Sequence, residues 1–198
     1  MNTLIDRREA LRKTAMIMGA AVSASTVAAF LYSCKSTPDL NYKPVFFNED
    51  QAFIISELAD IILPKTDTPG AKEAGVPSFI DGFVKDCYKT EDQKQILEGL
   101  KEFNENAVKV FGNKFIEGDA DQRLKYTLQI HEAAVKTMKD NPQQPRPFIL
   151  KIKELTMLGY FHSQVGATQV LQYQAVPGAY KGCIPLSEAG NGKTWATS

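Results

Sequence analysis

Residues 47–64 read Phe-Asn-Glu-Asp-Gln-Ala-Phe-Ile-Ile-Ser-Glu-Leu-Ala-Asp-Ile-Ile-Leu-Pro, and this stretch contains an amphipathic helix with its start and stop signals. Asn48 is a favourable N-cap, and Gln51 three positions later completes the capping-box pattern. Pro64 ends the helix because it has no amide hydrogen and its ring clashes with the preceding turn. The apolar residues in between recur at helical spacing and predict one buried face: Ile55, Leu58, Ala59 and Ile62.

The chain beyond Pro64 predicts four more helices. Their starts are expected at Pro77, Thr90, Asp119 and about Phe148, and the fifth helix runs to about His162. Thr90 and Asp119 each have a glutamine at the capping-box position, namely Gln93 and Gln122. Periodicity places Cys87 on the buried stripe of the helix that starts at Pro77. The apolar stripe of the helix that starts at Asp119 is formed by Leu124, Leu128, His131, Val135 and Met138.

The segment after Ser163 loses the helical period. It is rich in glycine and proline, yet it keeps a set of apolar residues: Val170, Leu171, Tyr173, Tyr180, Ile184 and Trp195. Such residues need a surface to lie on, which is either the helices of this chain or another protein. The sequence therefore predicts an all-α fold, with a single compact domain of about five helices and an irregular, turn-rich C-terminal tail over residues 47–198.

Residues 1–33 have the three parts of a bacterial export signal. A basic region with the pair Arg7 and Arg8 comes first, an apolar stretch over 14–31 follows, and small residues lead to Cys34. The arginine pair predicts the twin-arginine route, and Cys34 predicts lipidation after cleavage. Simple cleavage nearby is the alternative, because Tyr32 is bulky where such sites prefer small residues. An uncleaved membrane anchor is the alternative, although the apolar stretch is short and diluted by Ser, Thr and Gly. We therefore expect a signal peptide over 1–33, a tether over 34–46 and a periplasmic, membrane-anchored lipoprotein.

Charge and cysteine content narrow the function. Four of the 23 basic residues and two of the 23 acidic residues lie in 1–33, which leaves residues 34–198 with a net charge of −2. No basic cluster with interleaved aromatic residues is present, so nucleic acid is not an expected partner. Cys87 and Cys183 remain once Cys34 is assigned to lipid, and three states stay open for them: a bridge within the chain, a bridge to another subunit, or free thiols.

The sequence carries no motif for a bound cofactor. It lacks a G-x-G-x-x-G fingerprint, a P-loop and a C-x-x-C-H haem motif, and two cysteines are too few for an iron–sulfur cluster. His131 and His162 are the only histidines, and nothing in their spacing indicates a zinc site. We therefore expect no catalytic, cofactor-binding or metal-binding residues in this chain. An enzyme that uses one of the histidines with a metal is the weaker alternative.

Three stretches resemble a known family. They are 61–81, which reads Ile-Ile-Leu-Pro-Lys-Thr-Asp-Thr-Pro-Gly-Ala-Lys-Glu-Ala-Gly-Val-Pro-Ser-Phe-Ile-Asp, then Gly-Tyr-Phe at 159–161, and Pro-Gly-Ala-Tyr-Lys-Gly-Cys-Ile-Pro at 177–185. With the twin-arginine leader, they are similar to the gluconate 2-dehydrogenase subunit 3 family. This family includes the small, or gamma, subunit of membrane-associated flavin-dependent sugar dehydrogenases.

The resemblance implies an accessory role. The partner would be a large catalytic subunit that holds FAD and oxidises a sugar or polyol, and a cytochrome subunit often accepts the electrons. The small subunit would support export, assembly and anchoring of that flavoprotein. A free-standing periplasmic lipoprotein that binds a small ligand or an envelope protein is the alternative. The tail and the 64–77 loop are expected to face the partner, with Tyr173, Tyr180 and Trp195 as candidate anchors; the other interpretation is that these aromatic residues pack on the chain's own helices.

Overall fold

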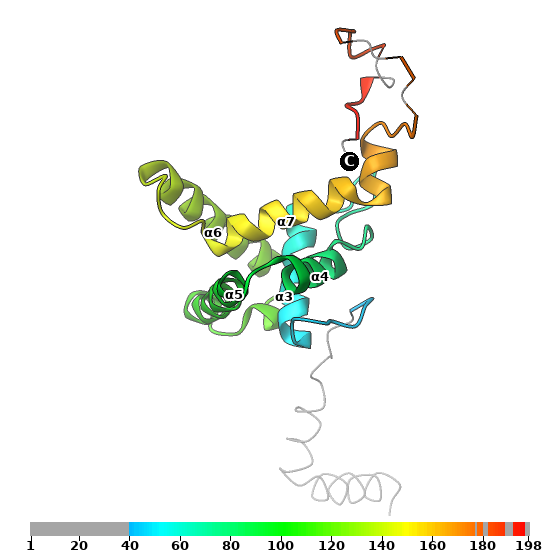
Figure 1. The fold of residues 1–198 in the computed structure, drawn as a ribbon. Helices are drawn as coiled ribbons and strands as arrows, with labels where there is room; N and C mark the ends of the chain where they lie inside the picture. The colour runs from blue at the N-terminus through cyan, green and yellow to red at the C-terminus, as the bar shows by residue number, and fades with distance from the viewer. Residues whose placement is uncertain (1–39, 177, 180–181, 189–191, 197–198) are drawn as a thin grey trace, which may run out of the picture. The chain divides into compact units, whose positions relative to one another are not determined.

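The computed structural model describes residues 40–176, 178–179, 182–188 and 192–196, and Figure 1 shows their arrangement. The described elements are α3 (Glu49–Ile62), α4 (Val76–Cys87), α5 (Thr90–Phe111), η1 (Phe115–Glu117), α6 (Ala120–Asp140), α7 (Phe148–His162) and η2 (Gly166–Val170). The all-α prediction is confirmed, because the only β-pairing in these ranges is an isolated bridge between Gln172 and Trp195. The predictions for Arg7, Arg8, Cys34 and Tyr180 fall outside the described residues.

Two of the three predicted capping boxes form. At the start of α3 the Asn48 side chain accepts from the Gln51 amide at 2.9 Å, and the Asn48 amide donates to the Gln51 side chain at 3.0 Å. At the start of α6 Asp119 and Gln122 repeat this exchange at 2.8 and 3.1 Å. Because each box satisfies two amides that lack a partner within the helix, the first turn is fixed by local sequence alone.

The third predicted capping box is wrong. The N-cap of α5 is Lys89, and Gln93 does not reach back to Thr90. The Gln93 side-chain amide instead donates to the carbonyls of Val84 and Lys85 at 3.0 and 2.9 Å. These carbonyls lie in the last turn of α4, where no amide further along the helix donates to them. Gln93 therefore holds the sharp connection between α4 and α5.

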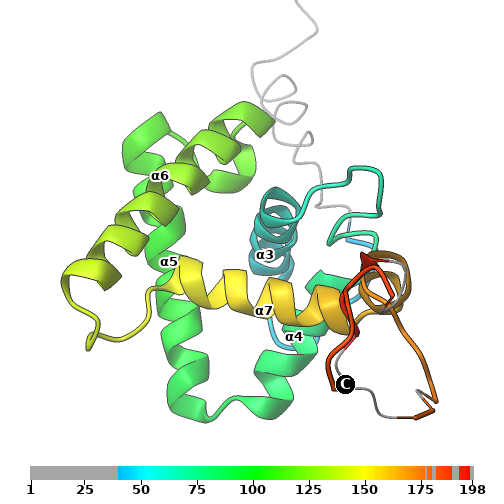
Figure 2. The same cartoon turned by 90° about the horizontal axis from the view of Figure 1, so that it is seen from above.

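Helix α7 is the centre of the domain. It packs against α3, α4, α5 and α6, and Figure 2 shows it running across the other helices. Close approach to α4 depends on Gly159, where a Cβ atom would lie 2.5 Å from the Phe79 ring. The core is built from apolar side chains of all five helices, including Ile55, Leu58, Ile80, Val84, Ile96, Ile152 and Leu155.

An aromatic cluster joins α5, η1 and α6. The rings of Phe103 and Tyr126 have centroids 4.9 Å apart, and those of Phe103 and Phe115 are 5.0 Å apart. The Tyr126 hydroxyl donates to the Phe103 carbonyl at 2.7 Å. Burial, with a smaller contribution from the nearby charge of Glu102, raises the pKa of Tyr126 to about 12. The only polar atom of this side chain is therefore satisfied inside the cluster.

We expect this tyrosine to make the protein sensitive to alkali. The folded state holds the phenolic proton more tightly than the unfolded chain, whose Tyr126 pKa is 10.0. The resulting stabilisation, about 3 kcal/mol, is fully present below pH 10 and is lost as pH rises through the folded pKa. Urea midpoints measured from pH 8 to 12 should fall less steeply for Tyr126→Phe than for the unchanged chain. The exposed Tyr173→Phe is the control, and an equal effect of both variants would contradict the assignment.

A buried carboxylate anchors the segment that precedes α3. Asp81, in the middle of α4, is 1% exposed. Its carboxylate accepts hydrogen bonds from three consecutive backbone amides: that of Val45 at 2.6 Å, Phe46 at 3.1 Å and Phe47 at 2.9 Å. The amides supply the partners that a buried charge requires, and they fix where the segment that starts at Leu40 joins the helices.

Several residues expected in the core are exposed. Cys87 is exposed because α4 ends at this residue, beyond the part that packs on α3 and α7. On α6, Leu124 and Leu128 are 43% and 50% exposed. On α7, Leu158, which helical spacing also predicts to be buried, is 37% exposed. The buried residues of α6 are Tyr126, Thr127 and Ala134 instead. The predicted stripe is thus a real apolar face of α6 that this chain covers only in part, because Leu124 and Leu128 are exposed while Val135 and Met138 pack against the core.

Candidate functional site

The 64–75 loop, which carries the most distinctive sequence, is folded tightly against the domain. The Ala71 amide donates to the Leu63 carbonyl at 2.9 Å, and the Val76 amide donates to the Ala71 carbonyl at 3.0 Å. Gly70 lies so close to the chain that a Cβ atom there would be 2.7 Å from the Lys65 nitrogen. Gly70 and Ala71 are thus required by close packing, and the exposed residues of the loop are 64–67, Glu73 and Gly75.

Ion pairs tie the same loop to two helices. Glu57 on α3 pairs with Lys72 of the loop and, at 3.2 Å, with Arg123 of α6. Lys72 also lies 3.5 Å from Asp60. The Glu57 side chain is 14% exposed, so its charge is largely removed from water and needs these partners. The geometry points to a structural role for these carboxylates.

The end of α7 is where the loop and the tail are both held. The Tyr160 hydroxyl donates to the Pro69 carbonyl at 2.8 Å. The Tyr160 carbonyl accepts from the Ser163 hydroxyl at 2.7 Å, and the same hydroxyl oxygen accepts from the Gly166 amide at 3.0 Å. A change at this junction would therefore reach both elements that the sequence predicts to face a partner.

After η2 the tail folds back, so that residues 194–196 lie beside Gln172. The Gln172 amide donates to the Thr194 carbonyl and the Ala196 amide donates to the Gln172 carbonyl, each at 2.8 Å. Between these points the chain forms a shallow hollow of about 740 Å³ that is lined by Cys183, Ile184, Pro185, Leu186 and Trp195, among others. Several apolar side chains of the tail are exposed to solvent: Trp195 is 41% exposed and Tyr173 is 58% exposed.

These positions bear on the predicted interface. Tyr173 and Trp195 are not covered by the helices of this chain, which keeps them available as partner anchors. Cys87 and Cys183 are both free and exposed in the structure, so the bridge within the chain is not formed. The bridge from Cys183 to another subunit stays a prediction.

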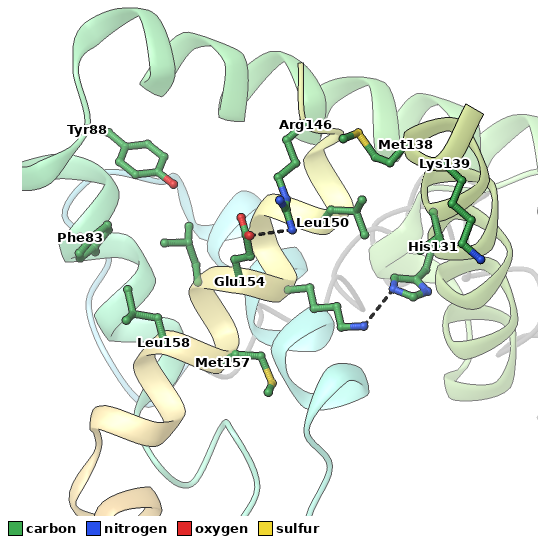
Figure 3. Close-up of a pocket in the computed structure, with 13 residues that line it drawn as sticks. Phe83, Tyr88, His131, Met138, Lys139, Arg146, Leu150, Glu154, Met157 and Leu158 are labelled. Carbon is green, nitrogen blue, oxygen red and sulfur yellow. Dashed lines mark hydrogen bonds and ion pairs between the residues drawn. The ribbon is translucent and has the colours of Figure 1, made fainter. Parts of the chain in front are cut away.

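A second apolar surface, which the sequence did not reveal, lies between α6 and α7. We define this α6/α7 groove by Val135 and Met138 of α6, by Leu150, Met157 and Leu158 of α7, and by Phe83 and Tyr88 at the end of α4. The space that these side chains line has a volume of about 790 Å³. Figure 3 shows most of them around it. Met157 is 36% and Leu158 is 37% exposed.

The rim of the α6/α7 groove is mostly basic. Lys139, Arg146 and Lys153 line it together with His131, and Glu154 is the only carboxylate among the lining residues. Arg146 pairs with Glu154 at 2.7 Å, and the Lys153 amine lies 3.1 Å from the His131 ring nitrogen. Burial, followed by the charges of Asp92 and Glu154, raises the pKa of Tyr88 above its ordinary value.

The two histidines lie on different helices, His131 on α6 and His162 at the end of α7. His131 contacts Lys153, and His162 contacts the Leu158 carbonyl at 2.9 Å through its ring nitrogen. Within the described ranges no three His, Cys, Asp or Glu side chains are grouped as metal ligands. The described part of the chain is a small helical protein with two exposed apolar surfaces, namely the hollow of the tail and the α6/α7 groove.

Comparison with known protein families identifies the family of this helical protein. The chain belongs to the Gluconate 2-dehydrogenase subunit 3 family, which it matches over residues 49–178. This confirms the resemblance drawn from the 61–81 stretch. No match is found among the curated proteins or among the solved structures. The family description names a subunit of a dehydrogenase complex, so assembly with other subunits is implied.

None of the helices in the described ranges is both long enough and apolar enough to cross a bilayer.

Proposed function

We propose that this chain is a noncatalytic accessory subunit that supports the export, assembly and membrane anchoring of a gluconate-type, FAD-dependent sugar or polyol dehydrogenase. The family match over residues 49–178 carries this proposal, because the family is described as subunit 3 of gluconate 2-dehydrogenase. The cofactor FAD would be held by the large subunit, and a cytochrome subunit is a further candidate partner.

The exposed apolar surfaces support a role in assembly. Single exposed apolar residues are ordinary, but a contiguous group of them marks a contact site. Ile184, Leu186 and Trp195 line one hollow of the tail, beside the exposed Cys183. Aromatic side chains such as Trp195 contribute strongly to protein–protein contacts when they become buried.

The leader supports the parts of the proposal that concern export and anchoring. A twin-arginine signal at Arg7 and Arg8 carries folded cargo, so a flavoprotein without its own leader could be exported while bound to this chain. Lipidation of Cys34 would then hold the complex at the periplasmic face of a membrane. One lipid-modified end gives attachment without a membrane-spanning helix.

Export is tested by changing the leader alone. The double substitution Arg7→Lys and Arg8→Lys keeps the positive charge but removes the arginine pair, and Arg12→Lys is the matched control. We expect the double variant to strand both this chain and a large flavin-containing protein inside the cell, whereas the control exports both. Flavin absorbance and mass of proteins that co-purify with the tagged chain from solubilised membranes provide the readout.

The result that overturns the proposal is equally clear. If the unchanged chain is purified from membranes alone, and export of the flavin-containing dehydrogenase is normal in cells that lack it, the accessory role is wrong. Turnover or a tightly bound prosthetic group in the isolated chain would also exclude a noncatalytic role.

A further inference from the structure

The apolar face of α6 continues into the α6/α7 groove as one surface. Leu124 and Leu128 are exposed on α6, and Val135 and Met138 follow on the same side at helical spacing. From residue 124 to residue 138 this stripe is about 21 Å long, at 1.5 Å per residue. An occupant of about four helical turns would cover it.

The charge on this surface is opposite to that of the domain. Residues 34–198 carry a net charge of −2, yet three lysine or arginine residues and a single carboxylate line the groove. Arg146 is paired with Glu154, while Lys139 and Lys153 have no carboxylate within ion-pair distance among the described residues. Two unneutralised amines beside an apolar floor are complementary to an apolar segment flanked by carboxylates.

The shape of the surface distinguishes between kinds of occupant. The surface is a hollow that α6, α7 and the end of α4 line together, with Met138 on α6 and Met157 on α7 (Figure 3). An amphipathic helix that lies on a bilayer presents a convex apolar face, whereas a groove between helices receives a helix from another protein. Methionine side chains also adapt their shape to an inserted partner.

We propose that the α6/α7 groove, extended along α6 to Leu124, binds an amphipathic helix of the large dehydrogenase subunit whose apolar residues are flanked by Asp or Glu. This inference rests on the proposed accessory function and adds to it the second contact surface and the chemistry of its ligand. The tail and the groove would then hold the same partner at two places, which strengthens binding without requiring either contact to be tight.

The test uses the full-length, tagged chain purified with the flavin-containing subunit from solubilised membranes. Lys139→Glu together with Lys153→Glu reverses the two unpaired amines. Lys94→Glu together with Lys101→Glu makes the same charge change on the exposed surface of α5 and is the matched control. For the apolar floor, Met157→Ser is compared with Val110→Ser, which alters an exposed apolar residue of α5.

We expect the groove variants to recover about tenfold less bound flavin than the controls at low salt, because close interfacial charge pairs are lost or reversed. Circular dichroism must show the same helix content and melting temperature for each variant and its control. Recovery by the unchanged chain should decline as salt screens these pairs, while the double reversal should respond less.

The outcomes separate this inference from the proposed function. If the unchanged chain recovers no flavoprotein, the accessory role itself fails. If it recovers flavoprotein and the groove variants do so as well as the controls, the groove proposal alone is wrong. Loss of membrane association with an intact complex would identify a lipid surface as the occupant. A groove-dependent dimer of the purified chain would identify a second copy, and either result would overturn the proposal.

Discussion

Replacing Asp81 by alanine is expected to lower the free energy of unfolding by about 3–5 kcal/mol, a large part of the stability of a typical domain. The Asp81 side chain is 1% exposed. Its carboxylate accepts hydrogen bonds from the amides of Val45, Phe46 and Phe47 at 2.6–3.1 Å. Alanine would leave all three donors without their partner and open a gap in α4. The urea midpoint followed by circular dichroism measures the loss.

Two further substitutions keep this prediction testable if the alanine variant does not fold. Asp81→Asn preserves the shape but replaces one acceptor oxygen with a donor, so about half of the loss is expected. Asp86→Asn removes a charge from an exposed position on the same helix and should change stability by less than about 0.5 kcal/mol. Equal midpoints for Asp81→Asn and Asp86→Asn would show that the amide contacts do not stabilise the domain.

The contacts of Asp81 show which features the sequence can and cannot predict. Asp81 lies at helical spacing from Pro77 and Val84, which are both buried, yet the sequence pattern did not identify it as a buried acid. Its partners are backbone amides 34–36 positions earlier in the chain, and no sequence pattern marks an amide as a distant donor. By contrast, the capping boxes at Asn48 and Asp119 connect residues three positions apart, so local spacing predicted them correctly.

The apolar stripe of α6 shows a second limit. Periodicity identifies an apolar face but not the molecule that covers it, and Leu124 and Leu128 were assigned to the core of this chain because no partner is visible in one sequence. Helix α7 differs from a helix with a single buried face. It has apolar side chains on more than one face, because Met157 and Leu158 are exposed while Ile152 and Leu155 are buried. This is expected for a helix with contacts on several sides.

Cys87 illustrates the same problem at a helix end. The prediction that Cys87 is buried is wrong, because the last turn of α4 extends beyond the surface on which its middle turns pack. Gln93 failed as a predicted cap for a related reason. The carbonyls at the end of α4 compete for its side-chain amide, and their proximity follows from the sharp turn between the helices.

Replacing Gly166 by alanine is expected to release the tail from α7 while the five helices stay folded. A Cβ atom at this position would lie 2.0 Å from the Tyr160 carbonyl oxygen and 2.9 Å from the Phe161 Cα atom. These are backbone atoms inside or at the end of α7, so the clash is relieved by movement of η2. We expect local destabilisation of about 2–3 kcal/mol, which corresponds to a loss of roughly 30-fold or more in amide-exchange protection over residues 166–170.

Gly82→Ala is the matched control for this experiment, because a Cβ atom there meets nothing within 4 Å and alanine favours the helix. If the tail faces the large subunit, Gly166→Ala should also reduce the flavoprotein recovered with this chain, although the α6/α7 groove is unaltered. Normal recovery with an unprotected tail would assign partner binding to the groove and exclude Tyr173 and Trp195 as anchors. Unchanged protection of residues 166–170 would instead show that η2 tolerates a side chain, and that the sharp turn after Ser163 does not depend on glycine.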